Sequence, residues 1–87
     1  MDVDPDEVRP VITRLRRAQG QIGGVIAMLE DGRDCTQIVN QMAAAGKAVD
    51  RAGFALIARV MRCCATDPEE DCSEEMAAVE KLFLTLA

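Results

Sequence analysis

The feature that most constrains this chain is a stripe of apolar residues that runs at helical spacing through the middle of the sequence. Between Cys35 and Cys64 an apolar side chain recurs every three or four residues, the period of one face of an α-helix. Asp34 and Gln37 at its start form a variant of the helix-capping box. The stripe predicts a helix over residues 34–65 of about eight turns, which is unusually long for so small a protein.

A second helix is predicted before this central one. Apolar residues from Val8 to Leu29 follow the same three- and four-residue spacing and predict a helix over residues 6–30. Pro10 is expected in or before its opening turn, since a proline in the interior of a helix removes a backbone hydrogen bond. Gly32 fits the left-handed residue that often ends a helix.

A third helix is predicted over residues 68–86, although its start is ambiguous. The segments Asp67–Glu70 and Asp71–Glu74 both carry the acidic and capping residues that begin helices, and the pattern does not choose between them. No segment reads as a strand. We therefore expect an all-α fold, a single three-helix domain over residues 1–87 with an acidic tail over residues 1–8.

Composition excludes several functional classes. The chain of 87 residues contains no histidine, so it lacks Ser-His and Cys-His nucleophile pairs, and we expect no enzymatic activity. Its only aromatic residues are Phe54 and Phe83, which makes for a thin core that oligomerisation would extend. No apolar run is long enough to cross a membrane, and the acidic N-terminus is unlike a signal peptide. A cytoplasmic protein without a membrane partner is expected.

Cys35 and Cys64 form a pair that one chain cannot bring together. On a continuous helix they face almost the same direction but lie about 43 Å apart. In an antiparallel dimer with its two-fold axis near Val49 and Asp50, Cys35 of one chain would lie beside Cys64 of the other. Small residues around this midpoint, from Ala43 to Gly53, favour the close approach of two such helices. The pair predicts two identical dithiol sites per dimer, each formed by Cys35 of one chain and Cys64 of the other.

The other two cysteines carry weaker predictions. Cys63 points about 100° away from Cys64 on the helix and is interpreted as a packing residue or a spare thiol. Cys72 is interpreted as a loop residue. The spacing of the four cysteines does not match a four-cysteine zinc site, and a structural disulfide is not expected in a reducing compartment.

Basic residues gather in the middle of the chain although the whole chain is acidic, with a formal net charge of -5. Residues 9–29 contain four arginines and no acidic residue, so the usual salt-bridge partners along a helix are missing. An arginine cluster without compensating acids, repeated by oligomer symmetry, predicts a surface that binds phosphates. The candidate residues are Arg14, Arg16, Arg17, Lys47 and Arg51.

Together these features resemble the CsoR family of bacterial metal- and thiol-responsive repressors. The matching residues are Arg14–Gln21, Asp34-Cys35, Gln41–Ala45 and Cys64. The resemblance implies an antiparallel dimer that assembles into a dimer-of-dimers tetramer, and release from operator DNA when an inducer reacts at the inter-chain site. It also implies that Arg14 and Arg51 contact double-stranded operator DNA, with the other three basic residues in support.

The chain departs from the copper-sensing members of that family. Val60 occupies the position where they carry a histidine ligand, Asp34 replaces a tyrosine, and Glu80 matches their outer-sphere glutamate. A dithiol without histidine is similar to the persulfide-sensing, CstR-like branch. The primary interpretation is therefore a repressor without an obligatory cofactor, whose Cys35–Cys64 cross-chain pair reacts with a persulfide or polysulfide.

Two alternatives stay open at this point. A Cu(I)-sensing repressor could bind the metal through Cys35, Cys64 of the partner and Cys63 as a third sulfur ligand, because thiolates suit soft Cu(I). A copper or sulfur carrier without a DNA role would explain the cysteines but not the arginine cluster. Binding to duplex DNA separates the carrier from both repressors.

Overall fold

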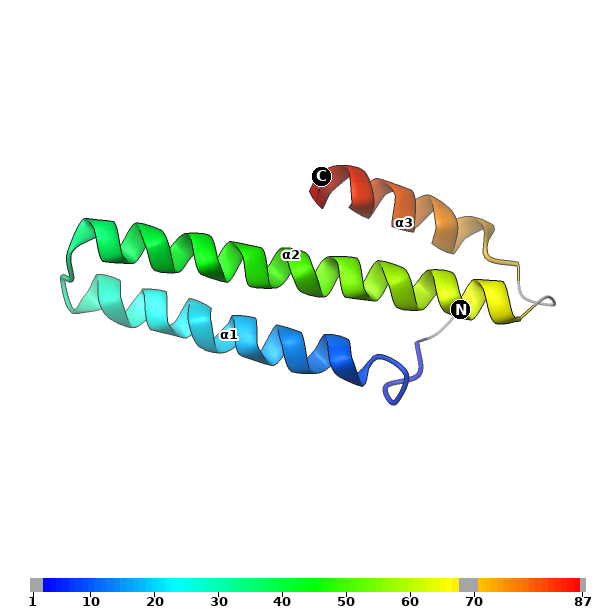
Figure 1. Cartoon of the computed structure of the whole chain (residues 1–87), viewed down its shortest axis with the longest axis horizontal. Helices are drawn as coiled ribbons and strands as arrows, with labels where there is room; N and C mark the ends of the chain where they lie inside the picture. The colour runs from blue at the N-terminus through cyan, green and yellow to red at the C-terminus, as the bar shows by residue number, and fades with distance from the viewer. Residues whose placement is uncertain (1–2, 68–70, 87) are drawn as a thin grey trace.

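The described part of the chain forms three α-helices (Figure 1). The computed structural model describes residues 3–67 and 71–86. Helix α1 covers Arg9–Glu30, α2 covers Cys35–Thr66 and α3 covers Ser73–Leu86. The predicted all-α fold is confirmed: these residues contain no strand, and the central helix is the longest, with 32 residues. None of the helices in the described ranges combines the length and the apolar character that a membrane span needs.

Local signals explain where α1 begins and ends. It begins at Arg9 instead of residue 6, because residues 5–8 form a turn in which the amide of Glu7 donates to the carbonyl oxygen of Asp4 at 3.0 Å. Pro10 lies in the first turn of α1, where a missing backbone donor costs nothing. Gly32 adopts a φ of 67° after the helix, the left-handed conformation that glycine tolerates best.

The other two helices begin at acidic caps. The side chain of Asp34 accepts a hydrogen bond from the backbone N–H of Thr36 at 3.1 Å, so Thr36, not Gln37, supplies the donor. Asp71 accepts from both the backbone N–H and the hydroxyl of Ser73. The second of the two competing signals therefore starts α3. Of the predicted range 68–86, residues 68–70 lie outside the described residues, and residues 71 and 72 are not helical.

The helices lie side by side in a flat arrangement whose extents are 54 × 26 × 13 Å. Helix α1 runs antiparallel to α2, and α3 packs along the C-terminal half of α2 (Figure 1). The seam between α1 and α2 buries residues at seven-residue spacing on each helix, the repeat of a coiled-coil contact. These are Val11, Ala18 and Val25 on α1 and Ala45 and Ala52 on α2.

Helix α3 is held on α2 by a few contacts. The rings of Phe54 and Phe83 meet edge to face, with their centroids 5.9 Å apart, a favourable aromatic geometry. At Gly53 the two helices come close, because a Cβ atom built there would lie 2.7 Å from Leu86 Cδ1. These contacts fix α3 over one face of α2.

Much of the apolar surface is left uncovered by the chain itself. Several apolar residues of α1 are exposed although they belong to its apolar pattern, because two packed helices bury only the stripe of each that faces the other. We call the uncovered surface on one side of the α1–α2 seam the apolar face. It consists of Leu15, Ile22, Val39, Met42 and Val49, and Leu15, Ile22 and Val49 line a common hollow.

Candidate functional site

Three of the five predicted DNA-binding residues line one hollow between α1 and α2. Its lining residues are Arg14, Arg17 and Gln21 from α1 and Ala44, Ala48 and Arg51 from α2, and we call it the arginine hollow. The i, i+3, i+7 spacing on α1 places its three polar side chains on one face. The two alanines have no atoms beyond Cβ, which leaves the floor of the hollow open between the arginines.

The charge of the arginine hollow is uncompensated. Arg14, Arg17 and Arg51 are exposed, and within the described ranges none of them forms an ion pair. Two arginines elsewhere do, since Arg9 pairs with Asp6 and Arg33 with Asp31. A concentration of guanidinium groups without acids attracts phosphate, which their forked geometry binds through two hydrogen bonds.

The remaining two basic candidates lie elsewhere. Arg16 lines the hollow of the apolar face beside Ile22 and Val49, on the other side of the seam from the arginine hollow. Lys47 is exposed on α2 and lines neither hollow. The structure thus separates the five candidates into a cluster of three and two peripheral charges.

The two predicted sensing thiols lie near opposite ends of α2. Cys35 is exposed in its first turn, and Cys64 is half-buried in its last turn. Because α2 is continuous, the helical rise separates them by about 43 Å. A contact between Cys35 and Cys64 therefore requires a second chain, and the cross-chain pair remains a prediction.

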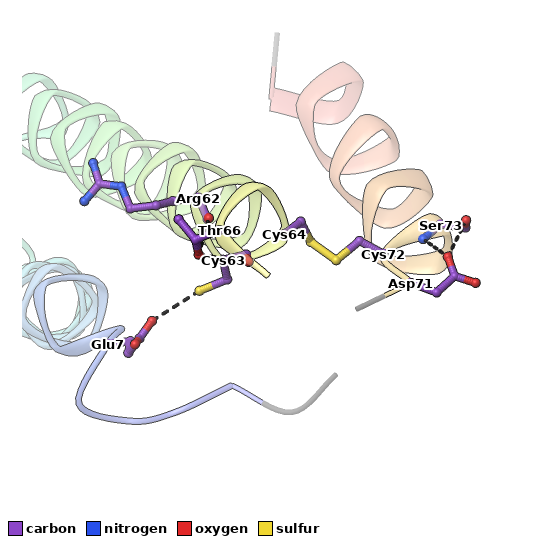
Figure 2. Close-up of a disulfide and its surroundings, with 8 residues drawn as sticks. All are labelled: Glu7, Arg62, Cys63, Cys64, Thr66, Asp71, Cys72 and Ser73. Carbon is purple, nitrogen blue, oxygen red and sulfur yellow. Dashed lines mark hydrogen bonds between the residues drawn. A yellow bond between two sulfur atoms is a disulfide. The ribbon is translucent and has the colours of Figure 1, made fainter. Parts of the chain in front are cut away.

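Within the chain, Cys64 has a different partner. Its sulfur is bonded to that of Cys72, which lies directly before α3, as Figure 2 shows. The Cα atoms of the two residues are 5.9 Å apart, inside the usual range for a disulfide. No disulfide was expected from the sequence. The signal that could have indicated it is the position of these two cysteines on either side of a short helix connection.

Cys63 points away from this pair (Figure 2). Its thiol donates a hydrogen bond to Glu7 Oε2 at 3.2 Å. That hydrogen bond, followed by desolvation and the negative charge of Glu7, raises the pKa of the Cys63 thiol, while Arg59 and Arg62 oppose the shift. No pattern in the sequence indicated the contact with Glu7, 56 positions earlier in the chain.

The residues predicted to form or surround a Cu(I) site do not lie close together within one chain. Val60 lies half-buried in an apolar hollow that also contains Val79 and Leu82 of α3. Glu80 is exposed and lines a separate hollow beside Met61. Among the described residues no group of three or more cysteine or carboxylate side chains is placed to hold a metal ion. A Cu(I) site would have to be completed by a second chain.

The small residues at the middle of α2 have uses that the sequence interpretation missed. Ala45 and Ala52 are buried and face α1, and Gly53 accommodates Leu86 of α3. These three residues therefore serve packing within the chain and cannot also form the contact between two copies of α2. Gly46 is still exposed, with no atom within 4 Å of its Cβ position.

Comparison with known proteins decides the family. The profile of a family described as metal-sensitive transcriptional repressors matches residues 7–85. The chain belongs to this family. The copper-sensing transcriptional repressor CsoR of Mycobacterium ulcerans is 27% identical over 78 residues, which are 90% of this chain and 66% of that protein. No solved structure gave a significant match.

Family membership confirms the predicted resemblance to CsoR proteins. It does not separate the persulfide-sensing branch from the copper-sensing one.

Proposed function

We propose that this repressor binds duplex operator DNA through the arginine hollow and releases it when an inducer reacts at Cys35 of one chain and Cys64 of its partner. The observation that carries the proposal is the gathering of Arg14, Arg17 and Arg51 in one hollow. Three guanidinium groups without acidic partners form a surface suited to the DNA backbone.

The relative position of the two surfaces supports this proposal. The arginine hollow and the apolar face lie on opposite sides of the α1–α2 seam, because their lining residues occupy opposite flanks of both helices. Copies of the chain that associate through the apolar face would leave the arginine hollows open to DNA. Homo-oligomerisation would then multiply the phosphate contacts instead of blocking them.

The proposed inducer is a persulfide or polysulfide. The thiolate of Cys35, which is exposed, takes the outer sulfur of an organic persulfide, and the thiol of that compound leaves. Cys64 of the partner then attacks the Cys35 persulfide, forming a cross-chain disulfide and releasing hydrogen sulfide. The apolar side chain of Val60 supports this chemistry over metal binding, because it supplies no ligand.

Cu(I) is the second candidate inducer, favoured by the copper-sensing relative from Mycobacterium ulcerans. Two thiolates suit this soft ion. Cys63 as a third ligand would have to leave its hydrogen bond to Glu7. In this alternative Cu(I) acts as a signal and not as a permanent cofactor. In either case the protein works in the reducing cytoplasm.

The DNA-binding part of the proposal is tested by fluorescence anisotropy of the reduced protein on duplex DNA from upstream of its own gene. We expect Arg14→Ala and Arg51→Ala to weaken binding and each to reduce the slope of log affinity against log salt by about 1. Arg33→Ala is the matched control, because Arg33 is exposed and paired with Asp31. An unchanged salt slope in both hollow variants would exclude the arginine hollow as the DNA site.

The sensing part is tested by anaerobic titration of the protein–DNA complex with an organic persulfide and, separately, with Cu(I). Release by the persulfide alone supports the persulfide sensor, and release by Cu(I) alone supports the copper sensor. Cys35→Ser should bind DNA normally but no longer respond. A normal response of this variant would exclude the cross-chain pair.

A further inference from the structure

We infer that Cys64 and Cys72 form a redox pair within one chain, which withdraws Cys64 from the cross-chain thiol pair and makes the repressor insensitive to its inducer. The inference rests on the proposed function for the role of Cys64. The pairing itself rests on the arrangement of α2 and α3.

Both cysteines are fixed by the elements that carry them. Cys64 belongs to the last turn of α2, and Cys72 directly precedes α3. Asp71 caps α3 by accepting two hydrogen bonds from Ser73, at 3.0 Å from its N–H and 2.7 Å from its hydroxyl. The contact between Phe54 and Phe83 holds the same helix along α2. Cys72 is therefore held beside Cys64 with their Cα atoms 5.9 Å apart.

The adjacent Cys63 is excluded from this pair by its orientation. Figure 2 shows its sulfur directed to Glu7, on the side of α1, while the sulfur of Cys64 is directed to α3. One step along a helix turns a side chain by about 100°. The bond to Cys72 is thus selective for one of two neighbouring thiols.

The two possible partners of Cys64 compete for the same face of α2. Helical spacing places Cys35, Val49, Gly53, Val60 and Cys64 on that face. Its first part is open, since Cys35 and Val49 are exposed. Its last part is covered by α3, which approaches Gly53 and lines a hollow together with Val60. A sulfur atom bonded to Cys72 cannot at the same time bond to Cys35 of a partner or ligate a metal.

A hydroperoxide can supply the oxidising equivalents. The thiolate of Cys64 attacks the peroxide oxygen, which gives a sulfenic acid and, for hydrogen peroxide, one molecule of water. The thiol of Cys72 then attacks that sulfur, the S–S bond forms and a second water leaves. Two thiols lose two electrons in total, and the peroxide takes them up.

The expected consequence is a repressor that still binds DNA but ignores its inducer. The arginine hollow is lined by residues of α1 and α2 alone, so a bond that fixes α3 leaves it intact. Cys35 remains free in this state, but its partner thiol has been consumed. Reduction restores the response.

The pairing is tested by treating the reduced protein with hydrogen peroxide, blocking free thiols and digesting with trypsin and a glutamate-specific protease. Cleavage after Arg62, Glu69, Glu70 and Glu74 separates Cys63 and Cys64 from Cys72. We expect a linked pair of peptides 63–69 and 71–74. The link should persist in Cys63→Ser, the matched control, and disappear in Cys72→Ser and Cys72→Ala, whose helix content is checked by circular dichroism.

The consequence is tested by anisotropy on the same samples. Oxidised wild-type protein should bind DNA like the reduced protein but show no release by inducer. Peroxide-treated Cys72→Ser cannot form the Cys64–Cys72 bond and should not lose its response to the inducer in this way. Oxidation that links Cys35 to Cys64 across chains instead, or release of DNA from the Cys64–Cys72 form by inducer, overturns the inference. If the reduced protein fails to bind DNA, the proposed function fails, and the peptide map still decides the pairing.

Discussion

At the scale of single residues, the structure gives two adjacent cysteines opposite surroundings. Cys63 donates to a carboxylate, while Cys64 is bonded to another sulfur. The sequence predicted that the two point in different directions, since the helix turns by about 100° between them. It did not predict their partners, because Glu7 and Cys72 approach through the packing of other helices. Local periodicity contains no information on that packing.

We predict that Cys63 is alkylated more slowly than Cys35 in the fully reduced protein near pH 8. The hydrogen bond to Glu7 raises the pKa of Cys63, so a smaller fraction of it is the reactive thiolate. Glu7→Gln removes the negative charge and should accelerate the alkylation of Cys63. The measurement is the rate of iodoacetamide labelling at each cysteine, followed by mass spectrometry.

Asp6→Asn provides the control for this comparison. Asp6 neighbours Glu7 but pairs with Arg9, so its replacement should leave the labelling rate of Cys63 unchanged. Equal rates in Glu7→Gln and the wild-type protein would show that the carboxylate does not control this thiol.

At the scale of helices, caps and periodicity predicted the elements well, whereas exposure was not predictable. Gly32 and Asp34 carry strong local signals, and they lie where the first helix ends and the second begins. The start of α3 was ambiguous because two acidic segments compete, and only Asp71 is used. Val11 and Leu15 belong to one apolar pattern, yet Val11 is buried and Leu15 is 46% exposed. The number of neighbouring helices decides such differences.

We predict that Ala52→Leu destabilises the α1–α2 pair by about 1–3 kcal/mol, the usual cost of overpacking. Ala52 is only 1% exposed, so a larger side chain would push the two helices apart. Ala58→Leu is the matched control, because Ala58 is exposed on the same helix. Urea unfolding followed by circular dichroism measures both. Equal stabilities of the two variants would contradict this packing of the seam.

The cap of α3 should make its stability depend on pH. Hydrogen bonds from the side chain and backbone of Ser73 lower the pKa of Asp71. A lowered folded-state pKa stabilises the protein above the ordinary pKa, and this contribution is lost as the pH falls through the lowered value. Asp71→Asn retains an acceptor but does not titrate. We therefore expect the Tm of the wild-type protein to fall relative to that of Asp71→Asn as the pH falls from 7 to about 2. A constant difference in Tm would contradict the cap.

At the scale of the whole molecule, the sequence predicted a thin core for a chain of this size. The structure shows where apolar surface is left uncovered as a result. Among the described residues, the flat three-helix arrangement buries six hydrophobic side chains, three of them alanines, and leaves the apolar face open beside the seam. The arginine hollow occupies the other side. The antiparallel dimer that the cysteines predict would need the middle of α2 for the contact between two chains, but Ala45 and Ala52 in this segment pack against α1. The apolar face offers a broader surface for a contact between two chains.

We predict that copies of the chain associate through the apolar face and that DNA binding depends on this association. Met42 belongs to this face and is 53% exposed, and burial of such a side chain contributes about 1.5–3 kcal/mol. Met42→Glu should therefore weaken association on the order of 10- to 100-fold, because it also places an unpaired carboxylate in the interface. Sedimentation equilibrium measures the effect on mass, and anisotropy measures the effect on DNA. Ala58→Glu adds the same charge on the opposite side of α2 and should leave the mass unchanged. A wild-type protein that is monomeric at concentrations where it saturates DNA would contradict the dependence, since a single arginine hollow would then suffice.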